Sequence, residues 1–298
     1  MVPRRIELRT QGFSVLCSTN WAKVPKLVFQ QSKYNLFYES NKKSCKKSSV
    51  FLSFNFYHLN IVLDIGNSLL KVGIFLNNEL ISYFEFKKNY YSHIKQLLES
   101  NKIFFSIVSN VSITDHKLIG LLSENTKLIE IDSNLKIPFK NKYKTKKTLG
   151  HDRLALVSSA VLQYPKENVL IIDLGSCITY DFVNYDNEYI GGAISPGINM
   201  RYRSLNSFTA NLPILQPKDI NFLTGKNTKE SIHSGVINGI ISELDGSINQ
   251  YRSKYEEIRI ILTGGDSKFL SKKIKNSIFT NSNFLLSGLN FLIELNKK

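Results

Sequence analysis

The sequence predicts an α/β protein whose two halves repeat one arrangement of strands and turns. An apolar run that ends in aspartate is followed by glycine and a small polar residue, once at Asp64 and again at Asp173. Two strand-like runs follow each aspartate, and helix-like segments alternate with strands along the rest of the chain. The repetition indicates an internal duplication of a βββα unit, and the alternation favours helices packed on sheets.

The first half is expected to open with three strands joined by turns at Gly66-Asn67 and Asn77-Asn78, because these residue pairs favour tight turns. The basic segment 136–147 is predicted to be a loop. The other expected elements of this half are the strands 59–64, 70–76, 80–86, 104–109 and 128–131 and the helices 91–100, 115–124 and 152–163.

The second half repeats the opening strands and then adds a long helix and a further strand. The expected elements are the strands 168–173, 177–185, 189–194 and 258–262 and the helix 228–255. Cys177, on the second of these strands, is expected to be a small core residue. We expect three regions: a basic, poorly ordered extension over 1–57, an N-terminal domain over 58–163 and a C-terminal domain over 164–298.

The composition excludes several classes of protein. Hydrophobic residues make up 42% and charged residues 21% of the 298 residues, which is typical of a soluble globular chain. The 3 cysteines form no CxxC pair, so neither a disulfide framework nor a zinc site is expected. No run of 18 apolar residues indicates a membrane span. These observations favour a reducing, cytoplasmic setting and no membrane partner.

The net charge of +15 first suggests a polyanionic partner. However, residues 1–57 contain ten basic and two acidic residues and so contribute +8, whereas the other 241 residues contribute +7. The excess therefore lies mostly in the N-terminal segment. That segment is expected to be a poorly ordered extension or residues translated from upstream of the natural start, with a transit peptide as the alternative. A nucleic-acid partner is not expected.

The repeated aspartates have the chemistry of a nucleotide site. Asp64 closes a buried strand, where an acid is costly unless a cation lies near it. Gly66 allows a ligand to approach the backbone, Asn67 and Ser68 offer donors to phosphate oxygens, and Lys71 adds a positive charge. Taken alone, the segment could equally be a hairpin turn whose polar side chains satisfy the backbone.

The second copy favours the nucleotide interpretation. Two acidic strand ends that face one cleft would suit a magnesium nucleotide, because the metal screens the repulsion between the carboxylates. The segment Thr263-Gly264-Gly265-Asp266 follows another buried strand and offers bare backbone where a nucleoside could lie. On a duplicated fold, these three elements predict an actin-like phosphotransferase.

Seven segments together carry a resemblance to a known family: Asp64 to Lys71, Tyr143 to Thr145 with Leu149 to Arg153, Asp173 to Asp181, Gly191 to Gly197, Thr209 to Pro213, Gly225 to Thr228 and Thr263 to Asp266. Through them, residues 60–298 resemble type III pantothenate kinases, which belong to the acetate and sugar kinase/actin superfamily. Ser68 and Ser176 stand where the family usually has Thr, and Lys147 stands where it often has Pro.

The resemblance implies duplicated actin-like (ribonuclease H-like) domains with a central cleft. It implies transfer of the γ-phosphate of ATP to the hydroxyl of pantothenate, which yields 4'-phosphopantothenate in the first step of coenzyme A biosynthesis. The implied cofactors are ATP, Mg²⁺ and a monovalent cation, K⁺ or NH₄⁺. The implied assembly is a cytoplasmic homodimer whose pantothenate pocket lies at the subunit interface.

The resemblance also assigns roles to individual residues. Asp152 would be the general base, since a carboxylate can accept the proton of the attacking hydroxyl. Asp173 would hold the monovalent cation. The residues implied to bind ATP are Asp64, Ile65, Gly66, Asn67, Ser68, Leu69, Leu70, Lys71 and Ser176. The residues implied to border pantothenate are Tyr143, Gly150, His151, Asp152, Arg153 and Thr228, the last of which could serve the partner's site.

Three other interpretations remain open at this point. Asp152 and Arg153 could be a helix cap with a solvated arginine. The chain could be a related acetate or sugar kinase, although the complete segment Leu149 to Arg153 argues against another acceptor. It could also be a nucleotide-sensing regulator without turnover, which the intact Asp64, Asp152 and Asp173 speak against.

Overall fold

The computed structural model describes residues 58–67, 69–110 and 115–297, all within the compact unit Phe51–Lys298. The extension expected over residues 1–57 lies outside the described residues. The predicted domain boundary between residues 163 and 164 stays a prediction.

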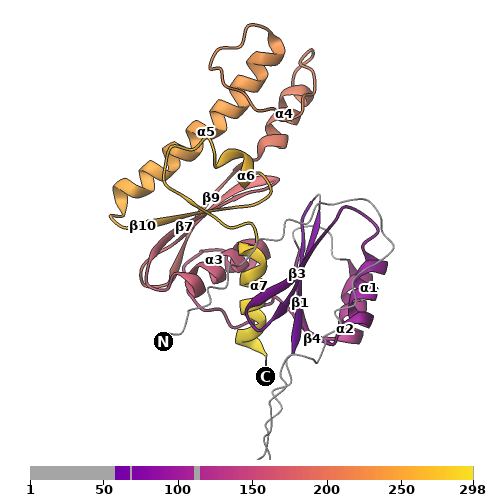
Figure 1. The fold of residues 1–298 in the computed structure, drawn as a ribbon. Helices are drawn as coiled ribbons and strands as arrows, with labels where there is room; N and C mark the ends of the chain where they lie inside the picture. Colours follow the sequence, from indigo (N-terminus) through magenta and orange to yellow (C-terminus); the bar gives the residue numbers. More distant parts are fainter. Residues whose placement is uncertain (1–57, 68, 111–114, 298) are drawn as a thin grey trace, which may run out of the picture. The chain divides into compact units, whose positions relative to one another are not determined.

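The first sheet contains the three-strand meander and two parallel strands beside it (Figure 1). Its strand order is β3-β2-β1-β4-β5; β1 pairs antiparallel with β2 and parallel with β4. The apolar faces of the two helices in this part pack against the sheet through Ile94 and Leu118. The elements are β1 (Leu59–Ile65), β2 (Leu70–Leu76), β3 (Glu79–Phe86), α1 (Tyr91–Ser100), β4 (Ile103–Asn110), α2 (His116–Asn125) and β5 (Lys127–Ile129).

The second sheet repeats this topology. Its order is β11-β10-β7-β8-β9-β6, so β9-β8-β7-β10-β11 corresponds strand by strand to β3-β2-β1-β4-β5 of the first sheet. Here too the central strand is antiparallel to one neighbour, β8, and parallel to the other, β10. The internal duplication is thereby confirmed. The strands are β6 (Lys140–Asn141), β7 (Asn168–Leu174), β8 (Cys177–Val183), β9 (Glu188–Pro196), β10 (Ile258–Thr263) and β11 (Phe279–Thr280).

Helices cover both faces of the second sheet. The long helix α5 packs on one face through Val236, Ile240 and Leu244, and α3 packs on the other through Leu156 and Ala160. The C-terminal helix α7 belongs to the cores of both sheets. The helices of this part are α3 (His151–Gln163), α4 (Ile198–Ser207), α5 (Thr228–Lys254), α6 (Ser267–Leu270) and α7 (Phe284–Asn296), with a 3₁₀ turn at Lys146–Thr148.

The helices α3 and α7 cross at very close range. A Cβ added at Gly288 would lie 1.9 Å from the carbonyl oxygen of Ala155, so the crossing requires glycine at this position. On the other side of α7, the buried Asn60 of β1 donates to Asn290 Oδ1 at 2.7 Å. These contacts join the C-terminal helix to α3 and to the first sheet.

Several sequence predictions need correction. The strand expected to reach 185 ends at Val183, the helix expected to reach 255 ends at Lys254, and the strand expected over 128–131 spans Lys127–Ile129. The segment 136–147, predicted to be a loop, contains β6 and most of the 3₁₀ turn. Cys177 is half-buried rather than in the core, because it is the first residue of β8, directly after a turn.

Among the described residues, no helix combines the length and the apolar character that a membrane crossing would require.

Candidate functional site

Asp64 and Asp173 occupy equivalent places at the ends of β1 and β7. Asp64 is only 8% exposed, and its pairing partner across the hairpin is Lys71 on β2. Asp173 is half-buried, and its partner on β8 is Thr179. The duplication therefore places one carboxylate at the same strand end in each sheet, as the sequence predicted.

The two carboxylates belong to one electrostatic group with Asp152 and Lys71. Burial raises the pKa of Asp64 to about 6, the charge of Lys71 opposes this rise, and the charge of Asp152 adds to it. Burial likewise raises the pKa of Asp173 to about 7, again opposed by Lys71 and reinforced by Asp64 and Asp152. A charge affects the pKa of another group in this way only when the two groups lie close together. We call Asp64, Lys71, Asp152 and Asp173 the carboxylate cluster.

Tight turns follow both strand-end aspartates. Gly66 N donates to Leu69 O at 3.0 Å, and Gly175 N donates to Cys177 O at 3.0 Å. Asn67 and Ser176 are exposed at these turns, where their polar groups are accessible to a phosphate. Ser68 lies outside the described residues. The second turn also rests against Gly197, where an added Cβ would lie 2.4 Å from Gly175 O.

The other residues of the first turn that were expected to bind ATP differ in how deeply they are buried. Ile65 and Leu70 are 7% and 2% exposed and pack in the core of the first sheet. Leu69 is half-buried. Ile65 and Leu70 can therefore offer a nucleotide only their backbone, whereas Lys71 offers its charge.

The glycine-rich segment after β10 lies directly against Asp173. Gly264 has a φ of 90°, and a Cβ there would lie 2.4 Å from Asp173 Oδ1. Asp266 N donates to Leu174 O at 3.0 Å, which fixes the segment beside the end of β7. The sequence predicted bare backbone in this segment, and the structure adds that it lies beside Asp173.

Asp152 is brought to the cluster by the first turn of α3. It is half-buried, and its Oδ1 accepts a hydrogen bond from Arg153 N at 2.8 Å. A carboxylate in the first turn is also favoured by the helix dipole. A Cβ at Gly150 would lie 2.3 Å from Asp152 Oδ1, so a side chain there would displace this carboxylate. The neighbouring His151 is half-buried, and burial lowers its pKa.

Arg153 is buried and ion-paired, so the interpretation of Arg153 as a solvated residue is wrong. Its side chain is 6% exposed, and its Nε donates to Asp181 Oδ1 at 2.8 Å. The guanidinium lies 5.6 Å from the ring centre of Tyr143 and 6.0 Å from that of Tyr189. Sequence reasoning assigned no role to Asp181 or Tyr189. The one available signal was the place of Asp181 at the end of the segment Asp173 to Asp181.

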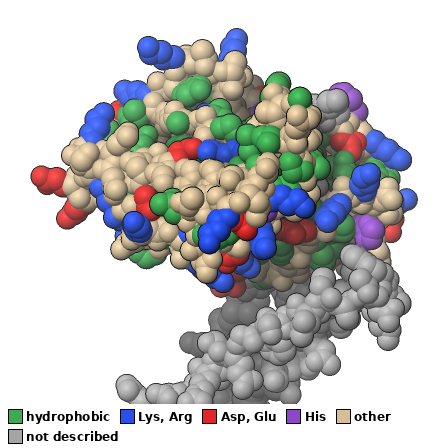
Figure 2. Space-filling model, turned by 90° about the horizontal axis from the view of Figure 1, so that it is seen from above, with side chains coloured by type: hydrophobic (Ala, Val, Ile, Leu, Met, Phe, Trp, Pro, Cys, Tyr) green, Lys and Arg blue, Asp and Glu red, His purple; other side chains and the backbone are tan. Residues whose placement is uncertain are grey.

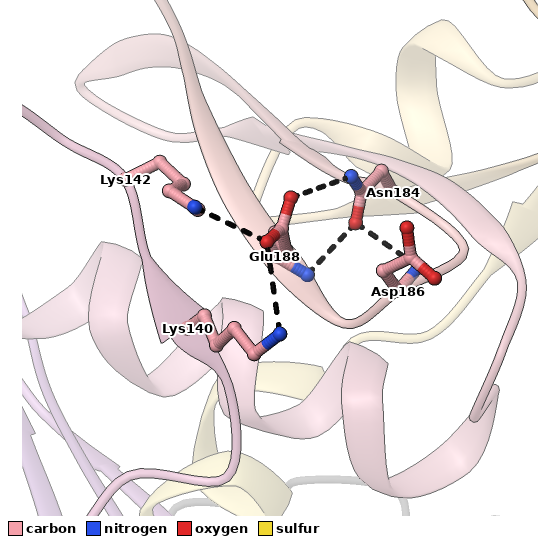
Figure 3. A network of polar contacts seen from close by, with 5 residues as sticks. All are labelled: Lys140, Lys142, Asn184, Asp186 and Glu188. Carbon is pink, nitrogen blue, oxygen red and sulfur yellow. Dashed lines mark hydrogen bonds and ion pairs between the residues drawn. The ribbon is translucent and has the colours of Figure 1, made fainter.

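The loop that carries Tyr143 is attached to the edge of the second sheet. Figure 3 shows Glu188 of β9 between Lys140 and Lys142, with the nearer lysine at 3.2 Å, and Asn184 donating to its other oxygen. The hydrogen bond from Asn184 lowers the pKa of Glu188, and the two lysines lower it further. The ring of Tyr143 then stacks on Tyr189 at 5.9 Å. These contacts place Tyr143 beside Arg153.

Thr228 stands apart from these residues. It is exposed at the start of α5, where Asn227 caps the helix by accepting from Glu230 N at 3.0 Å. This end of α5 lies opposite the end that leads into β10 (Figure 1). In the described part of the chain, no recorded contact joins Thr228 to Asp152 or Arg153.

The donor set fits a cation that also binds phosphate. Among the described residues, no three His, Cys, Asp or Glu side chains form a metal cage by themselves. Mg²⁺, however, is commonly held by one or two carboxylates together with substrate phosphates. Thr179 Oγ1, opposite Asp173, is buried without a hydrogen-bond partner in the described residues, so it too is available as a ligand.

Comparisons with known proteins agree on one family. The sequence profile described as "Type III pantothenate kinase" matches residues 60–250. A type III pantothenate kinase of Christiangramia forsetii is 50% identical over 241 residues, which cover 80% of this chain and 99% of that protein. One from Flavobacterium psychrophilum is 44% identical over 239 residues, again 80% and 99%.

A solved structure supports the fold. It is a Campylobacter jejuni protein assigned to the Baf family of transcriptional activators, with a TM-score of 0.52 and 24% identity. It covers 79% of this chain and 98% of its own. At this identity the likeness concerns the fold alone.

Proposed function

This chain belongs to the type III pantothenate kinase family, and we propose that its carboxylate cluster is the place where ATP phosphorylates pantothenate. The family activity is ATP-dependent formation of 4'-phosphopantothenate, the first step of coenzyme A biosynthesis, on an actin-like fold. The observation that supports the site is the equivalent placement of Asp64 and Asp173 at the ends of β1 and β7, with Lys71 opposite Asp64 and with the charge of Asp152 acting on both aspartates.

Asp152 is the general base in this proposal. The hydroxyl of pantothenate gives its proton to the Asp152 carboxylate while its oxygen forms a bond to the γ-phosphorus of ATP, and the bond from that phosphorus to the bridging oxygen of ADP breaks. The transfer depends mainly on positioning and on compensation of charge. The first turn of α3 supplies the positioning, because Arg153 N holds Asp152 Oδ1.

ATP lies along the two turns in this proposal. The backbone of Gly66, the side chain of Asn67 and the turn at Ser176 receive the phosphates, and Lys71 compensates their charge. Mg²⁺, when bound, neutralises charge on the transferred phosphoryl group. Asp173 holds the monovalent cation, which accords with the cost of leaving its half-buried carboxylate ionised without a cation.

Arg153 binds the carboxylate of pantothenate, and Tyr143, Gly150 and His151 border the same molecule. Two observations support this role: Arg153 directly follows the proposed base in the sequence, and its guanidinium lies against the ring of Tyr143. A guanidinium suits a carboxylate because its donors match the two oxygens.

The protein acts as a homodimer in this proposal, with Thr228 completing the partner's pantothenate pocket. Large apolar side chains lie exposed along α4 and the segment that leads to α5: Phe208 is 87% and Leu223 79% exposed. Figure 2 shows patches of hydrophobic side chains on the face seen from above, which is the α4 and α5 end of Figure 1. Exposed apolar patches often mark protein interfaces. A cytoplasmic location completes the proposal.

Replacing the proposed base tests the site. We expect Asp152→Asn to lower kcat for pantothenate by about 10²–10⁴-fold, because the amide cannot accept the hydroxyl proton. The assay is phosphopantothenate formation by the full chain with ATP, Mg²⁺ and K⁺. The matched control is Asp186→Asn, an exposed aspartate in the turn between β8 and β9, which should leave kcat unchanged. Undiminished turnover in Asp152→Asn would remove Asp152 from this role.

A further inference from the structure

Asp181 is a fully buried carboxylate that receives all its contacts on one oxygen. It lies on β8 with 0% exposure. Its Oδ1 accepts from Arg153 Nε at 2.8 Å and from the Tyr189 hydroxyl at 2.7 Å, and it lies 2.8 Å from Arg153 Nη2. Within the described residues, Asp181 Oδ2 and Arg153 Nη2 make no hydrogen bond of their own.

Stability alone does not account for this arrangement. A buried ion pair gains little over apolar side chains of similar volume, because both charges lose their hydration. Here the pair also leaves the buried Asp181 Oδ2 without a hydrogen-bond partner among the described residues, which costs further free energy. The arrangement does fix the orientation of the Arg153 side chain. Two donors on different elements, Arg153 on α3 and Tyr189 on β9, converge on one oxygen of Asp181 on β8.

Arg153 also contacts the proposed base through its backbone. The backbone N of Arg153 donates to Asp152 Oδ1, and the side chain of the same residue is held by Asp181. The aromatic rings of Tyr143 and Tyr189 lie against the same guanidinium. A group fixed before the substrate arrives loses less conformational entropy on binding and aligns the reacting atoms better.

We propose that Asp181, with Tyr189 as its second hydrogen-bond donor, is a positioning residue for the phosphorylation of pantothenate. It holds the Arg153 guanidinium in the orientation that binds pantothenate, and it thereby also anchors the first turn of α3. Asp181 touches neither substrate in this proposal and acts through Arg153. The inference rests on the proposed role of Arg153 in binding pantothenate.

The variant Tyr189→Phe tests the proposal with little structural disturbance. It keeps the ring that stacks on Tyr143 and removes only the hydroxyl that donates to Asp181. We expect the pantothenate KM to rise several-fold, up to about tenfold, which is the effect of losing one ordinary hydrogen bond. The KM for ATP should change by less than about twofold, because the ATP turns lie on other elements.

Tyr90→Phe is the matched control. Its hydroxyl also donates to an aspartate, Asp115, at 2.8 Å, but in the first-sheet part of the chain and outside the carboxylate cluster. It should leave both KM values unchanged. Asp181→Asn, where it folds, should raise the pantothenate KM more than Tyr189→Phe does; where it does not fold, Tyr189→Phe decides.

Arg153→Lys separates the possible failures. A raised pantothenate KM in Arg153→Lys together with an unchanged one in Tyr189→Phe would overturn the positioning role and leave the proposed site intact. An unchanged pantothenate KM in Arg153→Lys would overturn the substrate role of Arg153 and the inference with it. Equal rises of both KM values in Tyr189→Phe would indicate a general structural defect and also overturn the inference.

Discussion

The carboxylate cluster brings three carboxylates, those of Asp64, Asp152 and Asp173, together with one lysine, Lys71. Burial is the main cause that raises the pKa of Asp64 and of Asp173, and the positive charge of Lys71 opposes this rise for both residues. One lysine cannot balance three carboxylates, so the protein without ligands carries an electrostatic cost at this site. That cost is expected to fall when cations bind, and it should also depend on pH.

We therefore predict that the ligand-free protein loses stability as the pH rises through about 6 to 7. The unfolded carboxyls titrate near their ordinary pKa of 3.8, whereas the folded ones titrate at about 6 and about 7. The folded state thus binds more protons over this range, and stability that is present at low pH is lost as the pH increases. The loss should be on the order of 2 kcal/mol.

Urea unfolding at pH 5.5 and pH 8, without nucleotide or divalent metal, measures this difference. In the double variant Asp64→Asn/Asp173→Asn, which lacks both titrating groups, the difference between the two pH values should shrink markedly. The same difference in the double variant and in the natural sequence would show that other groups cause it.

At the scale of elements, what could be predicted from the sequence depended on whether an element shows a local pattern. The meander and the helices α1, α2 and α3 carry turn residues or periodic apolar positions, and these predictions are confirmed within a few residues. Helix α7 contacts both sheets, so apolar residues lie on most of its sides and no single apolar face marks it. The two-residue strand β6 exists through its pairing with the distant β9, which no local pattern encodes.

The crossing of α3 and α7 yields a prediction about stability. A methyl group at Gly288 would overlap the backbone of Ala155, so the helices must separate. We expect Gly288→Ala to lower the free energy of unfolding by about 1–3 kcal/mol. The matched control is Gly239→Ala in α5, where an added Cβ meets nothing within 4 Å. There alanine should stabilise the helix by about 0.5–1 kcal/mol.

Chemical denaturation of the two variants measures both effects. A Gly288→Ala protein as stable as the natural one would mean that the helices separate at no cost. If the free energy of unfolding falls in Gly288→Ala and rises in Gly239→Ala, the loss is caused by the helix crossing and not by the general effect of replacing a helical glycine.

At the scale of the whole molecule, the duplication explains which part of the site could be predicted. Asp64 and Asp173 were identifiable because the same unit recurs, and equal strand orders place the two carboxylates at equivalent strand ends. Asp181 and Tyr189 were not identifiable as partners of Arg153. Their contact depends on the register of β8 with β9 and on the packing of α3 against that sheet, and these are long-range properties.

The exposed position of Thr228 leads to a prediction about the proposed dimer. If Thr228 completes the pocket of the other subunit, Asp152→Asn and Thr228→Ala damage different halves of one composite site. Mixing the two impaired variants under conditions that exchange subunits should then restore activity. In a mixed dimer one site contains both substitutions and the other contains neither, so random exchange should return about one quarter of the natural activity.

Activity of the mixture is measured before and after exchange, and a mixture of Asp152→Asn with Asp152→Asn/Thr228→Ala serves as the control. That control should recover nothing, because every site in it lacks the base. No recovery in the first mixture, with subunit exchange verified by mass, would place Thr228 outside the partner's pocket. The residues at the exposed start of α5 would then have only a structural role, in which Asn227 accepts from Glu230 N and caps the helix.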